Sequence, residues 1–143
     1  MKKTILFILC IVIIILSIFW VKYVNYQAEQ RAIKEENLAY ETYLNKEITG
    51  RELTTAINRA VNNNETHSIT KDEQGFYIQN ELNSIEIEIK IIDNDTTYKM
   101  ETIYNGGMET FIQYYSEIYF ACTKIDYNDT GRVSYVVFEQ KTT

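Results

Sequence analysis

The longest feature of the hydrophobic pattern is an apolar run, Thr4 to Val21, which holds eighteen residues without a charge, a glycine or a proline. A helix rises about 1.5 Å per residue, so this run covers roughly 27 Å of a hydrocarbon core about 30 Å thick. Trp20 and Tyr23 lie at its far end, where amphipathic rings suit the headgroup layer. The pattern predicts a transmembrane helix over 4–21 after a short basic tail, 1–3.

A polar stretch without glycine or proline follows the apolar run, and we expect it to form a helical stem over 22–48 that is continuous to about Lys46. Ile33, Tyr40 and Leu44 fall on one face of this stem, but Glu36 and Asn37 interrupt the heptad pattern. The stem is therefore predicted to pack against its own domain, with a parallel coiled-coil dimer as the alternative.

A second helix is predicted from a capping box, in which Thr49 and Glu52 stand three residues apart. Apolar residues then recur every three or four positions, as a helix with one buried face requires. These are Leu53, Ala56, Ile57, Ala60 and Val61. We expect the three asparagines at 62–64 to end the helix.

The clearest strand is Ser84 to Ile92, where isoleucines alternate with charged residues. One buried and one solvated face predict an antiparallel sheet that is covered on a single side. Gly75 predicts a turn into a short strand over 76–78, and a further strand is expected over 97–104.

Gly106 and Gly107 are expected to end that strand, and apolar spacing then predicts a helix over 108–118. Two β-rich segments, 119–127 and 133–138, flank a turn and predict a hairpin. The segment 49–143 is therefore predicted to be one α+β domain, with helices packed on one face of a small antiparallel sheet.

Charge limits the partners of this domain. Of the fourteen basic residues, three lie at or before Lys22, so eleven face all twenty acids beyond it, a formal charge of −9. This balance argues against binding to nucleic acid and against lying flat on an anionic bilayer. Cys10 and Cys122 form no disulfide framework, and an exported domain without disulfides is more typical of a bacterium.

The apolar run is expected to remain as an uncleaved anchor. A signal peptide needs small residues at its cleavage site, and the segment 19–22 has none. A lipoprotein would need a small residue before Cys10, which follows Leu9. The flanking charges are nearly balanced, and the short tail favours a cytoplasmic amino terminus with the carboxy-terminal domain exported. The predicted location is the cell membrane, with a single pass, and the lipid bilayer is the first expected partner.

No catalytic, cofactor-binding or metal-binding residue is predicted. His67 has no ligand spacing around it, and Cys122 falls inside a predicted strand. The segment 93–95 resembles the start of a calcium loop, but Tyr98 and Tyr104 stand where an EF-hand needs glycine and glutamate.

Other polar groups are also expected to serve the fold. The acidic pairs Glu35 with Glu36 and Glu86 with Glu88 lie on predicted solvated faces rather than in a glycosidase arrangement. Gly106 and Gly107 lack the spacing of a phosphate loop. The sequons at Asn64, Asn94 and Asn128 are interpreted as polar turns.

Three runs, over 43–64, 104–120 and 131–140, resemble short single-pass membrane proteins of clostridial type, which have no assigned activity. This resemblance implies no catalytic residue. An apolar helix that leads through a stem to a small α+β head is also similar in layout to type IV pilins and pseudopilins. The chain departs from them because no Gly-Phe processing site precedes the apolar run and no glutamate stands near its start.

We therefore expect a non-enzymatic interaction module that is anchored in the membrane and serves a cell-envelope or secretion assembly, with an unidentified protein partner. An extracytoplasmic domain that binds a small ligand or glycan is the alternative, and an acid-type hydrolase is a third hypothesis. The surplus of aromatic residues between Tyr98 and Phe138 suits either kind of binding surface.

Overall fold

The computed structural model describes residues 2–93 and 95–142. The chain divides into two compact units, Met1–Glu35 and Glu36–Thr143. Helix α1, Lys2–Glu41, contributes its last turns, from Glu36, to the second unit, which we call the head.

In the described residues, the first unit consists of the part of α1 up to Glu35. An apolar window of this helix has a mean hydropathy of 3.2, and none of that window is buried. By length and composition α1 can therefore cross a membrane, as the apolar run predicts. The helix ends at Glu41 rather than near Lys46, because a tight turn follows, in which Asn45 adopts φ +59°, and leads into strand β1, Glu47–Thr49.

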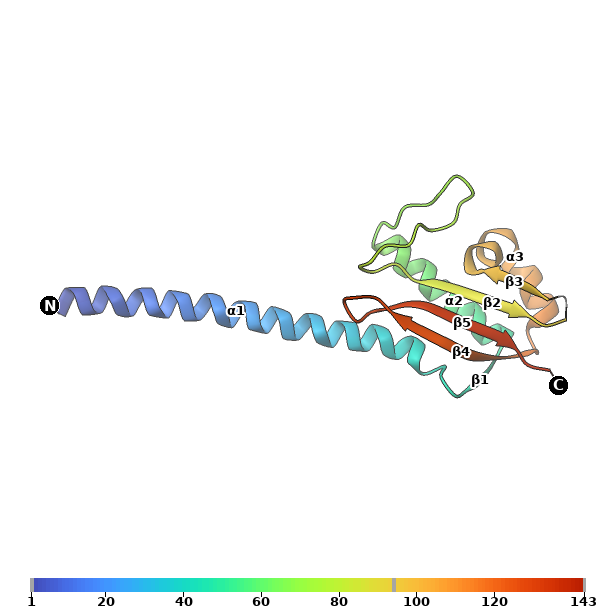
Figure 1. Cartoon of the computed structure of the whole chain (residues 1–143), viewed down its shortest axis with the longest axis horizontal. Coiled ribbons are helices and arrows are strands. Elements are labelled where there is room, and N and C mark those ends of the chain that lie inside the picture. Colours follow the sequence, from blue (N-terminus) through green and yellow to red (C-terminus); the bar gives the residue numbers. More distant parts are fainter. Residues whose placement is uncertain (1, 94, 143) are drawn as a thin grey trace. The chain divides into compact units, whose positions relative to one another are not determined.

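The head contains a five-stranded sheet in the order β1-β4-β5-β2-β3. Its other strands are β2, Glu86–Ile91, β3, Thr96–Lys99, β4, Tyr119–Tyr127, and β5, Val133–Gln140. Figure 1 shows β5 between β2 and β4. The α+β class is confirmed, but the sheet is mixed rather than antiparallel, since β2 and β5 run parallel.

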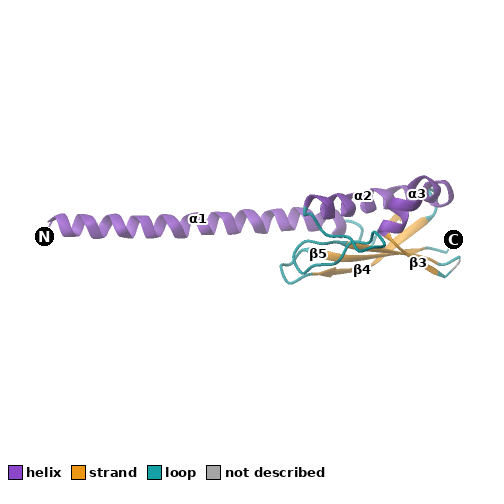
Figure 2. Ribbon diagram, turned by 90° about the horizontal axis from the view of Figure 1, so that it is seen from above, coloured by secondary structure: helices purple, strands orange, loops and turns teal. Residues whose placement is uncertain are grey.

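Two helices cover one face of the sheet, as Figure 2 shows for α2, Gly50–Thr66, and α3, Met100–Tyr115. Ile87, Ile89 and Ile91 of β2 point into this layer and are at most 1% exposed, whereas Lys90 on the opposite face is exposed. The alternation in the sequence thus gives the correct inner and outer faces of β2.

Helix α2 begins with the predicted capping box. The Glu52 carboxylate accepts from the Thr49 backbone N–H at 2.8 Å, and the Thr49 hydroxyl accepts from the Glu52 N–H at 3.3 Å. A Cβ on the first helical residue, Gly50, would lie 2.0 Å from the Tyr115 carbonyl oxygen. Only glycine therefore lets the start of α2 approach the end of α3 this closely.

Helix α3 differs from the sequence prediction. The strand expected over 97–104 stops at Lys99, and helix begins at Met100, because Met100 and Ile103 lie one turn apart and are both buried in the core. Gly107 does not end the element but kinks it, with φ +155° and ψ +59°. The helix then ends at Tyr115, before the predicted boundary at residue 118.

The carboxy-terminal hairpin is confirmed as β4 and β5, with a bulge between Cys122 and Lys124. By contrast, the short strand expected over 76–78 is not formed. Lys71 and Tyr77 make a single antiparallel bridge, and the Glu101 carboxylate accepts from the Tyr77 N–H at 3.0 Å.

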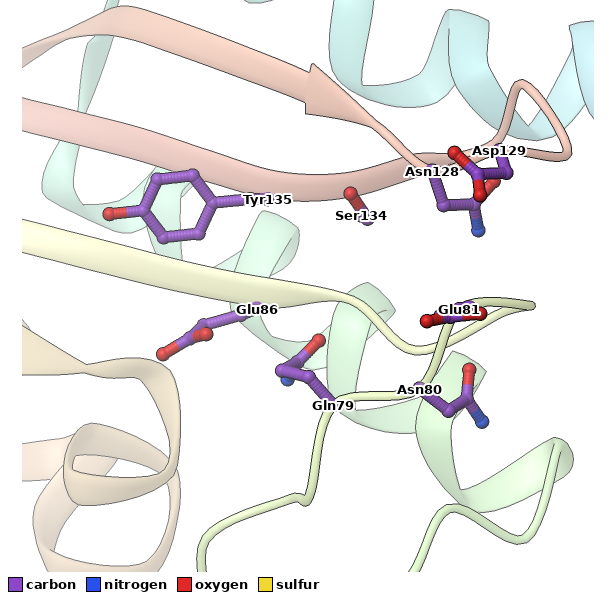
Figure 3. A pocket seen from close by; sticks show the side chains of 8 residues that line it. All are labelled: Gln79, Asn80, Glu81, Glu86, Asn128, Asp129, Ser134 and Tyr135. Atoms are coloured by element: carbon purple, nitrogen blue, oxygen red, sulfur yellow. The ribbon is translucent and has the colours of Figure 1, made fainter.

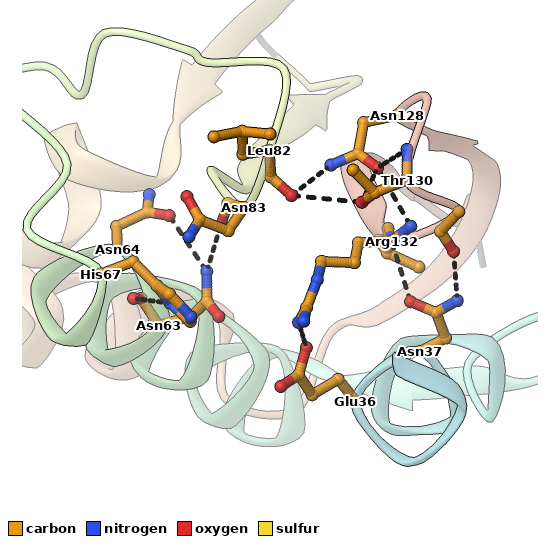
Figure 4. A network of polar contacts seen from close by, with 12 residues as sticks. Glu36, Asn37, Asn63, Asn64, His67, Leu82, Asn83, Asn128, Thr130 and Arg132 are labelled. Atoms are coloured by element: carbon orange, nitrogen blue, oxygen red, sulfur yellow. Dashed lines mark hydrogen bonds and ion pairs between the residues drawn. The ribbon is translucent and has the colours of Figure 1, made fainter. Parts of the chain in front are cut away.

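Two buried asparagines, Asn64 and Asn37, both drawn in Figure 4, hold the parallel strand pair at its starting end. The Asn64 side chain on α2 bonds both the N–H and the C=O of Ile85, each at 2.8 Å. Asn37 on α1 donates to the Gly131 carbonyl at 2.7 Å and accepts from the Val133 N–H at 2.8 Å. Each side-chain amide thus pairs with backbone groups where a strand begins.

Candidate binding groove

An aromatic groove of about 260 Å³ lies between β3 and α3. Tyr98 comes from β3, and Phe111, Tyr114 and Tyr115 come from the part of α3 after its kink. Gly106 also lines the groove, and a Cβ at this position would meet no atom within 4 Å. The kinked helix thus leaves open space beside aromatic side chains.

The inner aromatic rings are fixed by packing. Phe111 and Tyr115 stack with ring centroids 5.0 Å apart, and Phe120 from β4 lies 6.1 Å from Phe111. Burial raises the pKa of the Tyr115 hydroxyl above its usual value, and Tyr98 adds to this effect. Tyr114 is different, because 68% of it is exposed although it lines the same groove. The packed inner rings and the exposed tyrosine together form a preorganised apolar surface.

Among the described residues, none that lines this groove is charged. The chain from Met100 to Thr123 has three glutamates and neither lysine nor arginine. Two of these glutamates, Glu109 and Glu117, are exposed. The groove is therefore apolar within acidic surroundings.

A second, polar groove of about 420 Å³ lies between the loop 79–83 and the β4–β5 turn (Figure 3). Several of its side chains already serve the loops. The Asn128 side chain donates to the Leu82 carbonyl at 2.8 Å, and the Asn80 side chain accepts from the Leu82, Asn83 and Ser84 N–H groups. This groove is held open by structural hydrogen bonds between two turns.

Charged side chains on the outer face of the sheet form ion pairs with one another. Lys90 bonds Glu139 at 2.7 Å, and Lys99 bonds Glu86 at 2.9 Å. The Tyr135 hydroxyl donates to Glu88 at 2.6 Å, and burial together with this bond raises the Tyr135 pKa. The acidic residues Glu86 and Glu88 thus have structural partners, which fits their assignment to a strand surface.

The other polar candidates from the sequence lie apart from the aromatic groove. His67 caps the end of α2, with its Nδ1 2.9 Å from the Asn63 carbonyl oxygen. Cys122 is buried in the core, and burial raises the pKa of its thiol. Glu36 pairs with Arg132 (Figure 4). These three side chains thus belong to a helix end, the core and a surface ion pair.

The candidate turns can be placed in part. Asp93 accepts from the Gln140 side chain at 2.7 Å, while Asn94 lies outside the described residues. Asn64 is fully buried in α2 rather than in a turn, whereas Asn128 lies in the β4–β5 turn. Across residues 2–93 and 95–142, no group of three or more His, Cys, Asp and Glu could hold a metal ion.

The sequence pattern does not predict the groove. The apolar spacing that predicts a helix over 108–118 includes Phe111 and Tyr115, which line the groove, and the aromatic surplus between Tyr98 and Phe138 does not by itself indicate a groove. The position of Tyr114 in the sequence could have indicated an exposed aromatic site, because this large side chain lies beside the apolar stripe of the helix rather than in it. Comparison with protein-family models, curated proteins and solved structures finds no match to this chain.

Proposed function

We propose that the chain is a non-enzymatic interaction module of a bacterial cell envelope. Helix α1 anchors the chain in the membrane, and the exported head binds a partner protein. The observation that carries this proposal is the aromatic groove beside exposed Tyr114. Protein interfaces are enriched in tyrosine, and their strongest contacts are large side chains that fill preformed pockets.

The anchor in this proposal is the apolar part of α1. Its length and hydropathy suit a single membrane crossing, and none of its apolar window is buried in the protein. The layout suits a component of a secretion or pilus-like assembly, in which one helix retains a head near the membrane.

Site-specific crosslinking tests partner binding. A photoreactive amino acid replaces Tyr114 in the groove, and in a matched control it replaces Tyr119, a tyrosine of β4 that is 51% exposed and does not line the groove. We expect one discrete crosslinked protein from position 114 and none from position 119. Equal crosslinking from both positions, or none from either, would contradict the proposal.

Protease treatment of intact cells tests the orientation. Exported heads are digested by added protease, whereas a marker protein of the cytoplasm survives. The mass of the membrane-bound chain then reports whether residues 1–25 remain attached. Protection of the head, or loss of that segment, would overturn the exported, uncleaved arrangement.

The polar groove supports a second candidate, capture of a small polar ligand or glycan outside the membrane. Its lining combines amides, a hydroxyl, the carboxylates of Glu81, Glu86 and Asp129, and the ring of Tyr135, groups that serve sugar recognition. Ligand-observed NMR with a panel of cell-wall sugars tests it, and we expect Tyr135→Ala to abolish any signal. A signal that survives this substitution would place the ligand elsewhere.

A further inference from the structure

The groove's chemistry also indicates what kind of segment the partner presents. We infer that the aromatic groove receives one large apolar side chain from a basic segment of the partner protein, with lysine or arginine on either side of it. This inference rests on the proposed function and specifies the partner's chemistry.

The shape and lining of the groove determine the central side chain. A volume of about 260 Å³ is below the range of about 300–1,000 Å³ typical of sites for drug-sized ligands, and it suits a single leucine or phenylalanine side chain. Besides the tyrosine hydroxyls, its polar side chains are the threonines at 102 and 110. Sugar recognition needs more directed donors and acceptors than this lining offers, so an apolar anchor fits better.

Charge determines the flanking residues. Residues 36–143 hold nine basic and eighteen acidic side chains, a formal charge of −9. Glu109 and Glu117, which stand near lining residues in the sequence, are exposed, whereas Lys99, the basic residue next to Tyr98, is paired with Glu86 at 2.9 Å. Cationic residues beside the anchor would be attracted to these carboxylates and could contact the exposed face of Tyr114. Acidic flanks would be repelled.

Gly106 provides a way to close the groove without disturbing the core. A Cβ there has no neighbour within 4 Å, and the residue lies inside α3, where side chains other than glycine are favoured. Gly106→Phe adds a ring at the lining of the groove without a clash at its Cβ, and we expect this ring to obstruct the partner's side chain. Gly106→Ala is the matched control, since it makes the same backbone change and leaves most of the groove open.

The test uses the full chain in nanodiscs of neutral phosphatidylcholine, with methyl-labelled Ile103 and Thr110 as NMR reporters in the groove. Three capped peptides are titrated: GKKGFGKKG, the same peptide with serine in place of phenylalanine, and the same peptide with glutamates in place of lysines. We expect the first to shift both reporters and each of the others to bind at least about tenfold more weakly. Raising the salt from about 0.05 M to about 0.5 M should weaken the first peptide several-fold.

The variants complete the test. Gly106→Phe is expected to reduce binding of the lysine peptide at least about tenfold and Gly106→Ala to reduce it far less, while Tyr119→Ala, outside the groove, binds as the parent chain does. Equal binding of the lysine and glutamate peptides, or undiminished binding to Gly106→Phe, would overturn the inference. If position 114 still crosslinks to one discrete protein in cells, only the inferred chemistry fails. Loss of that crosslink as well would also overturn the proposed function.

Discussion

Asn64 has the clearest structural role of any single polar residue in the head. It is fully buried, and its amide bonds both backbone groups of Ile85 just before β2. Asn64→Ala would leave a buried N–H and a buried C=O unpaired, at a cost of about 3 kcal/mol in unfolding free energy. Urea denaturation measures this loss. Asn62→Ala, an exposed change on the same helix, should cost under about 0.5 kcal/mol, and similar losses would refute the assigned role.

Glu52 should make stability depend on pH. The hydrogen bond from the Thr49 backbone N–H lowers the Glu52 pKa below 4.5, so its ionised form stabilises the head above the unfolded-state pKa. This contribution, about 0.5 kcal/mol for so exposed a cap, is lost as the pH falls from about 5 to about 3. Glu52→Gln keeps an acceptor without titrating there. Unfolding curves at several pH values should therefore show a smaller acid loss for the variant, and parallel losses would exclude the effect.

The distance along the chain between the interacting residues explains which of these roles could be predicted from the sequence. The capping box was predictable because Thr49 and Glu52 interact across three residues of one helix. The role of Asn64 was not, because its partner Ile85 lies twenty-one residues away and an asparagine triplet usually signals a helix end. Helix α2 instead continues to Thr66, because the buried Asn64 side chain is hydrogen-bonded to Ile85 and so stabilises the helix at this position.

At the scale of elements, the kink in α3 forms the groove, and the two adjacent glycines have different roles in it. Gly107 has φ +155°, and a Cβ there would lie 3.1 Å from the Thr110 hydroxyl oxygen. Gly107→Ala should therefore destabilise the head by about 1–3 kcal/mol. Gly106→Ala should be neutral or stabilise it by up to about 1 kcal/mol. Thermal unfolding compares the two, and a reversed order would disprove the kink's dependence on Gly107.

Element types were more predictable than element pairings. Alternating isoleucines identify β2, and the β4–β5 hairpin follows from one turn between two β-rich segments. The parallel pairing of β2 with β5 has no local signal, because it depends on where the hairpin inserts in the sheet. One clue is that Val136, Val137 and Phe138 form a continuous apolar run and are at most 3% exposed, as is typical of a central strand with a neighbour on each side. The groove was unpredictable for a related reason, since Tyr98 and Tyr114 meet only through the fold.

At the scale of the whole molecule, anchoring and partner binding are assigned to different segments, so they should be separable. The apolar run 4–21 lies in the unit that ends at Glu35, whereas the core cluster and the groove belong to residues 36–143. A chain lacking residues 4–21 should therefore lose its membrane association and keep the cooperative unfolding of its head.

Alkaline carbonate extraction followed by sedimentation measures the first effect. The full chain is expected to stay in the membrane pellet, because about eighteen apolar residues in lipid resist extraction, and the shortened chain should move to the supernatant. Tyr114→Ala in the full chain is the converse control, since it should weaken partner crosslinking from a second groove position, Thr110, while membrane retention is unchanged. If the shortened chain still pelleted without aggregating, the head itself would bind the membrane. That result would contradict a head whose charge of −9 disfavours an anionic bilayer.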